Sequence, residues 1–176
     1  FLDDGSPDSV RFTRHCRWLL DQEVGLAIFG TNSEANSLSL TEKRALLDSL
    51  LEAGLPSTRM MPGTGACARP DTIELTRHAV SSRCSGVLML PPFYYKGVSD
   101  EGLYRAFSTV IDKVANEQLC VYLYHIPAVS GITISHSLID RLLKAYPQVV
   151  AGIKDSSGDW DNTLKMIERF GPEGFS

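Results

Sequence analysis

The sequence lacks the patterns that mark a metal site, a nucleotide site or a membrane span. Its four cysteines are 51, 17 and 36 residues apart and form no C-x-x-C pair. They therefore indicate reduced thiols rather than a zinc site or a disulfide framework. The histidines are as scattered, so we expect no bound metal. No apolar run reaches the roughly 18 residues of a membrane span.

The chain also has little excess charge. Seventeen Lys and Arg against 21 Asp and Glu give a net charge of −4, without the basic surface that nucleic acid or anionic lipid requires. Hydrophobic residues make up 43% and charged residues 22%, as in globular proteins. With no secretory signal, these values favour a cytoplasmic protein that acts on a small molecule, without a cofactor and with neither nucleic acid nor a membrane as partner.

Short apolar runs alternate with helical patterns along the whole chain. Five buried strands are predicted, centred near residues 28, 61, 89, 123 and 152. Helices are predicted over residues 8–24, from Ser39 to Gly54, from Pro70 to about Cys84, from Ser99, from Ser135 and before Gly171. The clearest start is Ser39-Leu-Thr-Glu42, a capping box.

Continuous apolar strands joined by helices predict an α/β fold with a parallel sheet. Two architectures fit, a (β/α)8 TIM barrel and an open doubly wound sheet. No strand is followed by either common glycine-rich phosphate loop, which lowers the nucleotide-binding versions of the open sheet. A barrel needs about 250 residues and eight strands, so about three strands would be missing. No linker interrupts the series, so we expect residues 1–176 to form one domain, with both ends cut.

The stretch from Val149 to Asp159 places Lys154 at the end of an apolar strand. Burial there would lower the pKa of the amine, and a neutral amine is the nucleophile that forms Schiff bases with ketones. Taken alone, Lys154 fits a solvated loop lysine better.

Other candidates follow the remaining predicted strands. Thr31 and Asn32 offer hydroxyl, amide and backbone donors for a carboxylate, or form an ordinary Asx-type turn. Tyr124 ends an apolar strand, either as a core tyrosine or as a proton shuttle beside an amine. His125 follows Tyr124, so strand alternation turns it to the opposite face, where we expect a structural role.

The order of these pieces resembles the dihydrodipicolinate synthase / N-acetylneuraminate lyase family of pyruvate-dependent class I aldolases. The matching motifs are Gly30-Thr31-x-x-Glu34, Gly63-Thr64-Gly65, Pro91-Pro92-Phe-Tyr94, Glu101-Gly102-Leu103-Tyr104, Tyr124-x-x-Pro127 and Gly152-Ile153-Lys154-Asp155. The tyrosine and lysine motifs, about thirty residues apart, form the most specific pair. The resemblance covers almost the whole chain.

The resemblance implies a site and an assembly. Lys154 would form the Schiff base and Tyr124 would be the catalytic tyrosine. Thr31 would lie between Tyr124 and Tyr94, the latter supplied by a neighbouring subunit, with Tyr95 as the alternative claimant. Thr31 and Asn32 would receive the carboxylate of a 2-keto acid. A homodimer or homotetramer is implied. Residues 1–176 would be a single (β/α)8 barrel domain, truncated at both ends, whose visible units are strands two to six.

Two departures bear on the substrate. Dihydrodipicolinate synthases carry an arginine at the position of Val129, and their Thr-Thr-Gly is Thr31-Asn32-Ser33 here. Imine chemistry is untouched by these changes, whereas a role in lysine biosynthesis is not supported. We therefore expect a Schiff-base-forming lyase or aldolase acting on pyruvate or a related 2-keto acid. The alternatives are a 2-keto-3-deoxy sugar acid dehydratase with the same imine, and a non-catalytic keto-acid-binding or structural homologue.

Overall fold

The computed structural model describes residues 1–176, except for the side chain of residue 173. Its strands are β1 (Val87–Met89), β2 (Val121–His125) and β3 (Val150–Asp155). Its α-helices are α1 (Ser9–Asp21), α2 (Leu40–Glu52), α3 (Arg69–Ser81), α4 (Asp100–Val114), α5 (Pro127–Ser130), α6 (His136–Ala145) and α7 (Trp160–Phe170). Short 3-10 turns are η1 (Thr31–Ser33), η2 (Ala35–Ser37), η3 (Ser57–Arg59) and η4 (Gly171–Glu173).

The long helices begin where their local signals predict. Ser39 and Glu42 form the reciprocal capping box at α2, which satisfies donors that the first helical turn leaves free. Ser99 and Ser135 cap α4 and α6 by accepting bonds from backbone N–H groups. The predicted apolar face of α4 is buried in full: Leu103, Phe107, Val110, Ile111 and Val114.

The sheet is parallel, with strand order β1-β2-β3. The prediction of regular strands near residues 28 and 61 was wrong. Those segments form only isolated parallel bridges, Leu26 with Met60 and Gly63 with Leu88. Phe29, with a φ of 59°, bends the first segment after a few residues, because a left-handed backbone cannot continue a strand.

The loops hold regular turns that periodicity did not predict. Helix α5 lies inside a predicted loop, with Pro127 in its first turn and Gly131 in the left-handed region at its end. The turns η1 and η2 are joined at Glu34, whose φ is 50°. Elements of three or four residues are too short to show a helical repeat in the sequence. Only the Pro or Gly residues at their ends indicate them.

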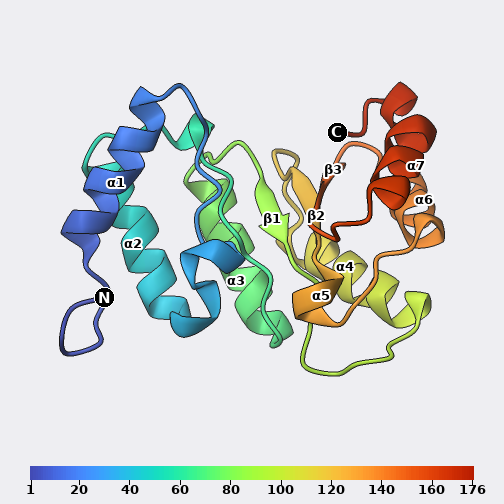
Figure 1. Cartoon of the computed structure of the whole chain (residues 1–176), viewed down its shortest axis with the longest axis horizontal. Coiled ribbons are helices and arrows are strands. Elements are labelled where there is room, and N and C mark those ends of the chain that lie inside the picture. Colours follow the sequence, from blue (N-terminus) through green and yellow to red (C-terminus); the bar gives the residue numbers. More distant parts are fainter.

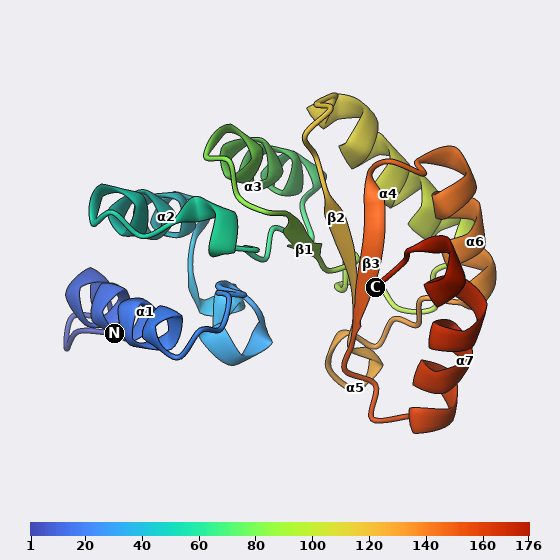
Figure 2. The same ribbon diagram turned by 90° about the horizontal axis from the view of Figure 1, so that it is seen from above.

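Helices lie outside the curved sheet, as seen from above (Figure 2). The core falls into two clusters. The larger one packs β1–β3 against α3, α4, α6 and α7, and the smaller one joins α1 and α2 to the extended segments around Ile28 and Met60. Among the helices that the structure describes, none is long and apolar enough to cross a membrane.

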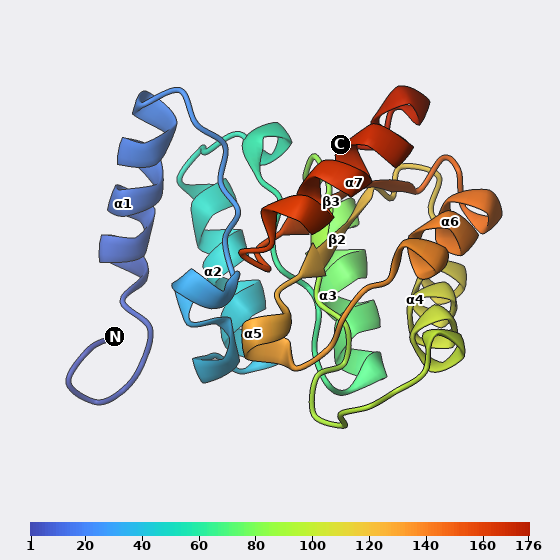
Figure 3. The same cartoon turned by 45° about the vertical axis from the view of Figure 1, so that its right-hand side comes forward.

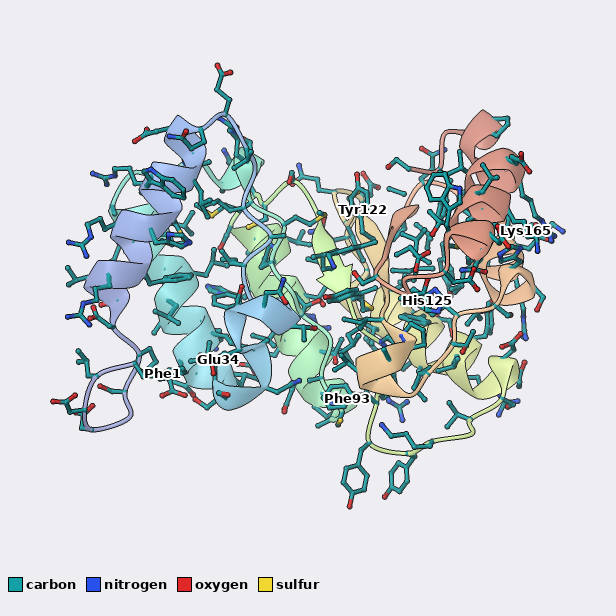
Figure 4. The ribbon with its side chains drawn as sticks, in the orientation of Figure 1. Phe1, Glu34, Phe93, Tyr122, His125 and Lys165 are labelled. Atoms are coloured by element: carbon teal, nitrogen blue, oxygen red, sulfur yellow. The ribbon has the colours of Figure 1, made fainter. Side chains whose placement is uncertain are left out.

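The carboxyl ends of the strands point to one end of the molecule, where η1, η2 and α5 also lie (Figures 1 and 3). Figure 4 labels Glu34 and Phe93 in loops at that end. In parallel α/β folds the loops after the strands carry the chemistry. The candidate residues therefore come from these loops and strand ends.

Candidate active site

Three segments far apart in sequence deliver Thr31, Tyr124 and Lys154 to one place. Thr31 opens η1 after the first extended segment, and the other two end adjacent strands, β2 and β3. Tyr124 and Lys154 are direct partners in the parallel register, so their side chains leave the sheet on the same face.

The contacts among the three are direct. The Lys154 ammonium lies 4.0 Å from the centroid of the Tyr124 ring, within the range of a cation–π contact. The Tyr124 hydroxyl donates to Thr31 Oγ1 at 3.2 Å. Lys154 Nζ also donates to Ser156 Oγ at 2.6 Å. An amine, a phenol and two hydroxyls thus form one connected polar group.

The surroundings of Tyr124 favour its phenolate form. Burial by itself would raise the pKa of Tyr124, whose residue is 5% exposed. The hydroxyl of Thr31 and the Lys154 ammonium outweigh that effect, and the pKa lies below its usual value. A phenol shifted in this direction exchanges protons more readily near neutral pH.

Lys154 is exposed, so burial does not lower the pKa of its amine here. Helices α4, α6 and α7 cover one face of the sheet, which carries Val121 and Leu123 of β2 and Val150 of β3. Tyr124 and Lys154 lie on the opposite face of the sheet, and Figure 2 shows α4, α6 and α7 on the outer side of the curved sheet. Proximity to Tyr124, rather than a dry pocket, is what distinguishes Lys154 among the lysines.

Thr31 and Asn32 form the start of η1. Among the described residues, the backbone N–H groups of Thr31 and Asn32 have no hydrogen-bond acceptor, while Ser33 N–H is bonded to Gly30. The Asn32 side chain is exposed and forms no hydrogen bond within the described part of the chain. Free donors beside the Thr31 hydroxyl suit an anionic group.

Tyr94 is not brought to the other three residues within this chain. It is 73% exposed, and its ring meets that of Tyr95 edge-on at 5.1 Å. Among the described residues Tyr94 makes no hydrogen bond to Thr31 or Tyr124. The role inferred for Tyr94 in a neighbouring subunit stays a prediction.

Gly63 and Gly65 allow neighbouring backbones to approach closely. A Cβ at Gly63 would lie 2.1 Å from the carbonyl oxygen of Phe29, and one at Gly65 would lie 2.4 Å from Leu90 N. Both contacts are with backbone atoms, so no side chain could move aside. The two glycines bring the first extended segment and the end of β1 together beneath the site.

Sequence reasoning missed two residues behind and beside Lys154. The Ser156 hydroxyl accepts a hydrogen bond from the Lys154 ammonium, and the Asp155 side chain is buried against His125, with Asp155 Oδ1 3.4 Å from His125 Nδ1. Asp155 belongs to the lysine motif but was given no role there, and the only signal for Ser156 was its place in the polar turn after β3. His125 is 3% exposed and lies between the sheet and helices α6 and α7 (Figure 4), as the alternation predicted.

The fold and this group of residues define a class. A parallel sheet covered by helices, with a lysine and a tyrosine at adjacent strand ends, defines an α/β protein of the kind in which the loops after the strands carry the chemistry. Within the described residues, no cluster of three His, Cys, Asp or Glu could hold a metal ion.

The family follows from comparison of the whole chain with known proteins. The model of the dihydrodipicolinate synthetase family matches residues 1–175, and the chain belongs to that family. A "DapA-like lyase" of Chloroflexus aurantiacus is 33% identical over 96% of the chain. The 4-hydroxy-tetrahydrodipicolinate synthase of Desulforamulus reducens is also 33% identical, over 99% of it. The chain spans 56% and 57% of the lengths of these two relatives.

Solved structures agree on the architecture. The dihydrodipicolinate synthase of Agrobacterium tumefaciens superposes with a TM-score of 0.94 at 32% identity, over 99% of this chain and 61% of that one. The YagE protein of E. coli K12, solved in complex with pyruvate, gives 0.84 at 28% identity, over 99% and 58% of the two chains. The predicted barrel architecture is thereby confirmed.

Proposed function

We propose that this chain carries the imine-forming site of a pyruvate-dependent lyase or aldolase. The observation that carries the proposal is the contact of Lys154 with Tyr124, whose hydroxyl bonds to Thr31. Membership of the dihydrodipicolinate synthetase family and the similarity to a protein solved with pyruvate support it.

The proposed chemistry begins at the Lys154 amine. Its nitrogen adds to the ketone carbon of a 2-keto acid, and the carbonyl oxygen leaves as water after protonation, so that an iminium ion remains. Tyr124 moves the protons in these steps, which its lowered pKa favours. The iminium accepts the electron pair of a neighbouring carbon–carbon bond as that bond breaks, which leaves an enamine. In the reverse direction the enamine donates this pair to the carbonyl carbon of the second substrate, and the iminium forms again.

Thr31 and Asn32 are the proposed receptors of the substrate carboxylate. Their backbone N–H groups and the Thr31 hydroxyl would donate to it, and donors fixed in advance stabilise charge without reorganisation. Thr31 would also hold the Tyr124 hydroxyl. Val129, which is 61% exposed on α5, offers no charge to a second substrate.

The proposed assembly is a homodimer or homotetramer of cytoplasmic subunits, each with one barrel domain. Tyr94 and Tyr95 are exposed on one loop, and large exposed aromatic side chains are frequent at subunit interfaces. Tyr94 of one subunit would then complete the group around Thr31 and Tyr124 in the next.

Reduction by borohydride tests the proposal. Pyruvate with borohydride should add the mass of a reduced pyruvate adduct at Lys154, and a Lys154→Arg variant should gain none while keeping its charge. Labelling at another lysine, or no labelling of the unaltered protein, would contradict the assignment. Release of pyruvate from the substrate separates a lyase from a dehydratase.

A further inference from the structure

A buried polar layer lies behind Lys154, on the face of the sheet opposite the proposed site. The register that pairs Tyr124 with Lys154 also pairs His125 with Asp155. His125 is 3% exposed and the Asp155 side chain 7%. The mechanism proposed above uses neither residue, although each is adjacent in sequence to a residue of the site.

Asp155 holds the turn that follows β3. One carboxylate oxygen, Oδ1, accepts from Ser157 N–H at 2.9 Å, and Oδ2 accepts from the Thr163 hydroxyl on α7. The carbonyl of His125 accepts from Ser156 N–H at 2.7 Å. Bonds from two sides therefore fix the residue whose hydroxyl accepts from the Lys154 amine.

The His125 ring lies close to Asp155 but forms no hydrogen bond with it. Its Nδ1 is 3.4 Å from Asp155 Oδ1, the same oxygen that holds Ser157 N–H. Among the described residues neither ring nitrogen of His125 has a hydrogen-bond partner. Unpartnered polar atoms in a core are costly and rare, so a role in positioning is a reason for this residue to be there.

We propose that Asp155 and His125 form a positioning pair, which holds the turn after β3 so that Ser156 Oγ fixes the Lys154 amine beside Tyr124. The proposal rests on the imine-forming function and adds to it a second pair of residues, on the opposite face of the same two strands. Both act through the backbone and Ser156, and neither touches the substrate.

The arrangement requires a neutral His125. Burial lowers the pKa of His125, and His136 on α6 acts in the same direction, while Asp155 on β3 opposes them. A protonated ring would compete with Ser157 N–H for Asp155 Oδ1. Acid would then loosen the turn and displace Ser156.

Two substitutions test the hold of the turn. Thr163→Val removes the hydroxyl that bonds to Asp155, and Asp155→Asn removes the charge at similar volume. Both should slow trapping of the pyruvate imine at Lys154 by about 10- to 100-fold, because small displacements of reacting groups lower the reaction rate strongly. Amide hydrogen exchange at Ser156 and Ser157 should accelerate. Asp161→Asn, at an exposed position early in α7, is the matched control and should change neither rate.

If both variants trap the pyruvate imine at a rate within twofold of that of the unaltered protein, the positioning role is overturned. If the unaltered protein is not labelled at Lys154, the proposed function fails instead, and amide exchange alone then decides whether the pair holds the turn. If amide hydrogen exchange at Ser156 and Ser157 is unchanged in both variants, the pair does not hold the turn, whatever the trapping experiment gives.

The pH profile separates positioning from mere packing. His125→Asn keeps a polar side chain that cannot be protonated, so the acid limb of imine formation should move to lower pH. A residue needed only for packing would lower the rate by the same factor at every pH, and that result contradicts the proposal.

Discussion

Tyr124 and Lys154 are register partners on adjacent parallel strands, and the lysine ammonium lies 4.0 Å from the centre of the tyrosine ring. Thirty residues separate the two positions in sequence, yet the sheet makes them neighbours. Their shared face brings the amine against the ring whose hydroxyl bonds to Thr31.

Tyr124→Phe should lower turnover by about 10²–10⁴-fold, the usual contribution of a positioned acid–base group. The ring that meets the Lys154 ammonium remains, so only the hydroxyl is tested. Steady-state rates with a 2-keto acid substrate measure the effect. Tyr122→Phe, two residues earlier on β2, is the control. An unchanged turnover rate in Tyr124→Phe would mean that Tyr124 serves only in packing.

Thr31→Val should raise the pKa of Tyr124, because it removes the hydroxyl that favours the phenolate. The loss of one hydrogen bond, about 1 kcal/mol, corresponds to roughly a fivefold fall in rate. Ultraviolet titration of the tyrosines and the pH–rate profile report the shift. Thr31→Ser keeps the hydroxyl and should behave as the unaltered protein; equal profiles for Val and Ser would argue against this role.

Gly63→Ala should destabilise the chain by about 3 kcal/mol, at the upper end for overpacking. Its Cβ would lie 2.1 Å from the Phe29 carbonyl oxygen, so two backbone segments would have to separate. Urea unfolding monitored by circular dichroism gives the change. Gly171→Ala, where a Cβ meets nothing within 4 Å, is the control, and similar midpoints for the two variants would refute the close approach.

Stability should fall in acid in two steps. The pKa of His125 is lowered chiefly by burial, so the folded state binds this proton less readily than the unfolded state. Stability from a neutral His125 is complete above about pH 6.5 and is lost as the pH falls through its folded pKa. Burial opposes the shift at Asp155, but its bonds to Thr163 and Ser157 outweigh burial and lower that pKa too. Its contribution disappears below about pH 3.8.

Urea unfolding at pH 5 and pH 7.5 checks the first step. A His125→Asn variant should show a smaller difference between the two pH values than the unaltered protein. His15→Asn alters a histidine on the exposed face of α1 and serves as the control. Equal pH dependence in all three proteins would show that His125 is not the group responsible.

The cysteines should react at very different rates. Burial raises the pKa of Cys16 and of Cys84 to about 11, and the thiolate is the reactive form. Cys67 is exposed. Iodoacetamide at pH 8 should therefore alkylate Cys67 well before Cys16 or Cys84, as mass spectrometry of the digested protein would show. Alkylation of Cys16 at the rate of Cys67 would mean that α1 does not stay packed.

Local chemistry in the sequence determined the helices and their order. A capping box at Ser39, serine caps at Ser99 and Ser135 and the apolar face from Leu103 to Val114 act within a few residues, so the chain segment itself contains the cause. The alternation of short apolar runs with these helices was enough to predict a parallel α/β fold, and the family resemblance selected the barrel. Strand regularity was less well predicted, because a single left-handed residue such as Phe29 interrupts a strand without changing its composition.

The sequence by itself determined which residues could do chemistry, and the tertiary structure decided which of them meet. Thr31, Tyr124 and Lys154 were separate candidates, each with an ordinary alternative, until the parallel register and the bend at η1 placed them in contact. The exposure of Lys154 and its bond to Ser156 could not be read from periodicity, since both depend on which face of β3 the helices cover. The pairing of His125 with Asp155 has the same origin, because a register is a property of two strands and neither strand encodes it alone.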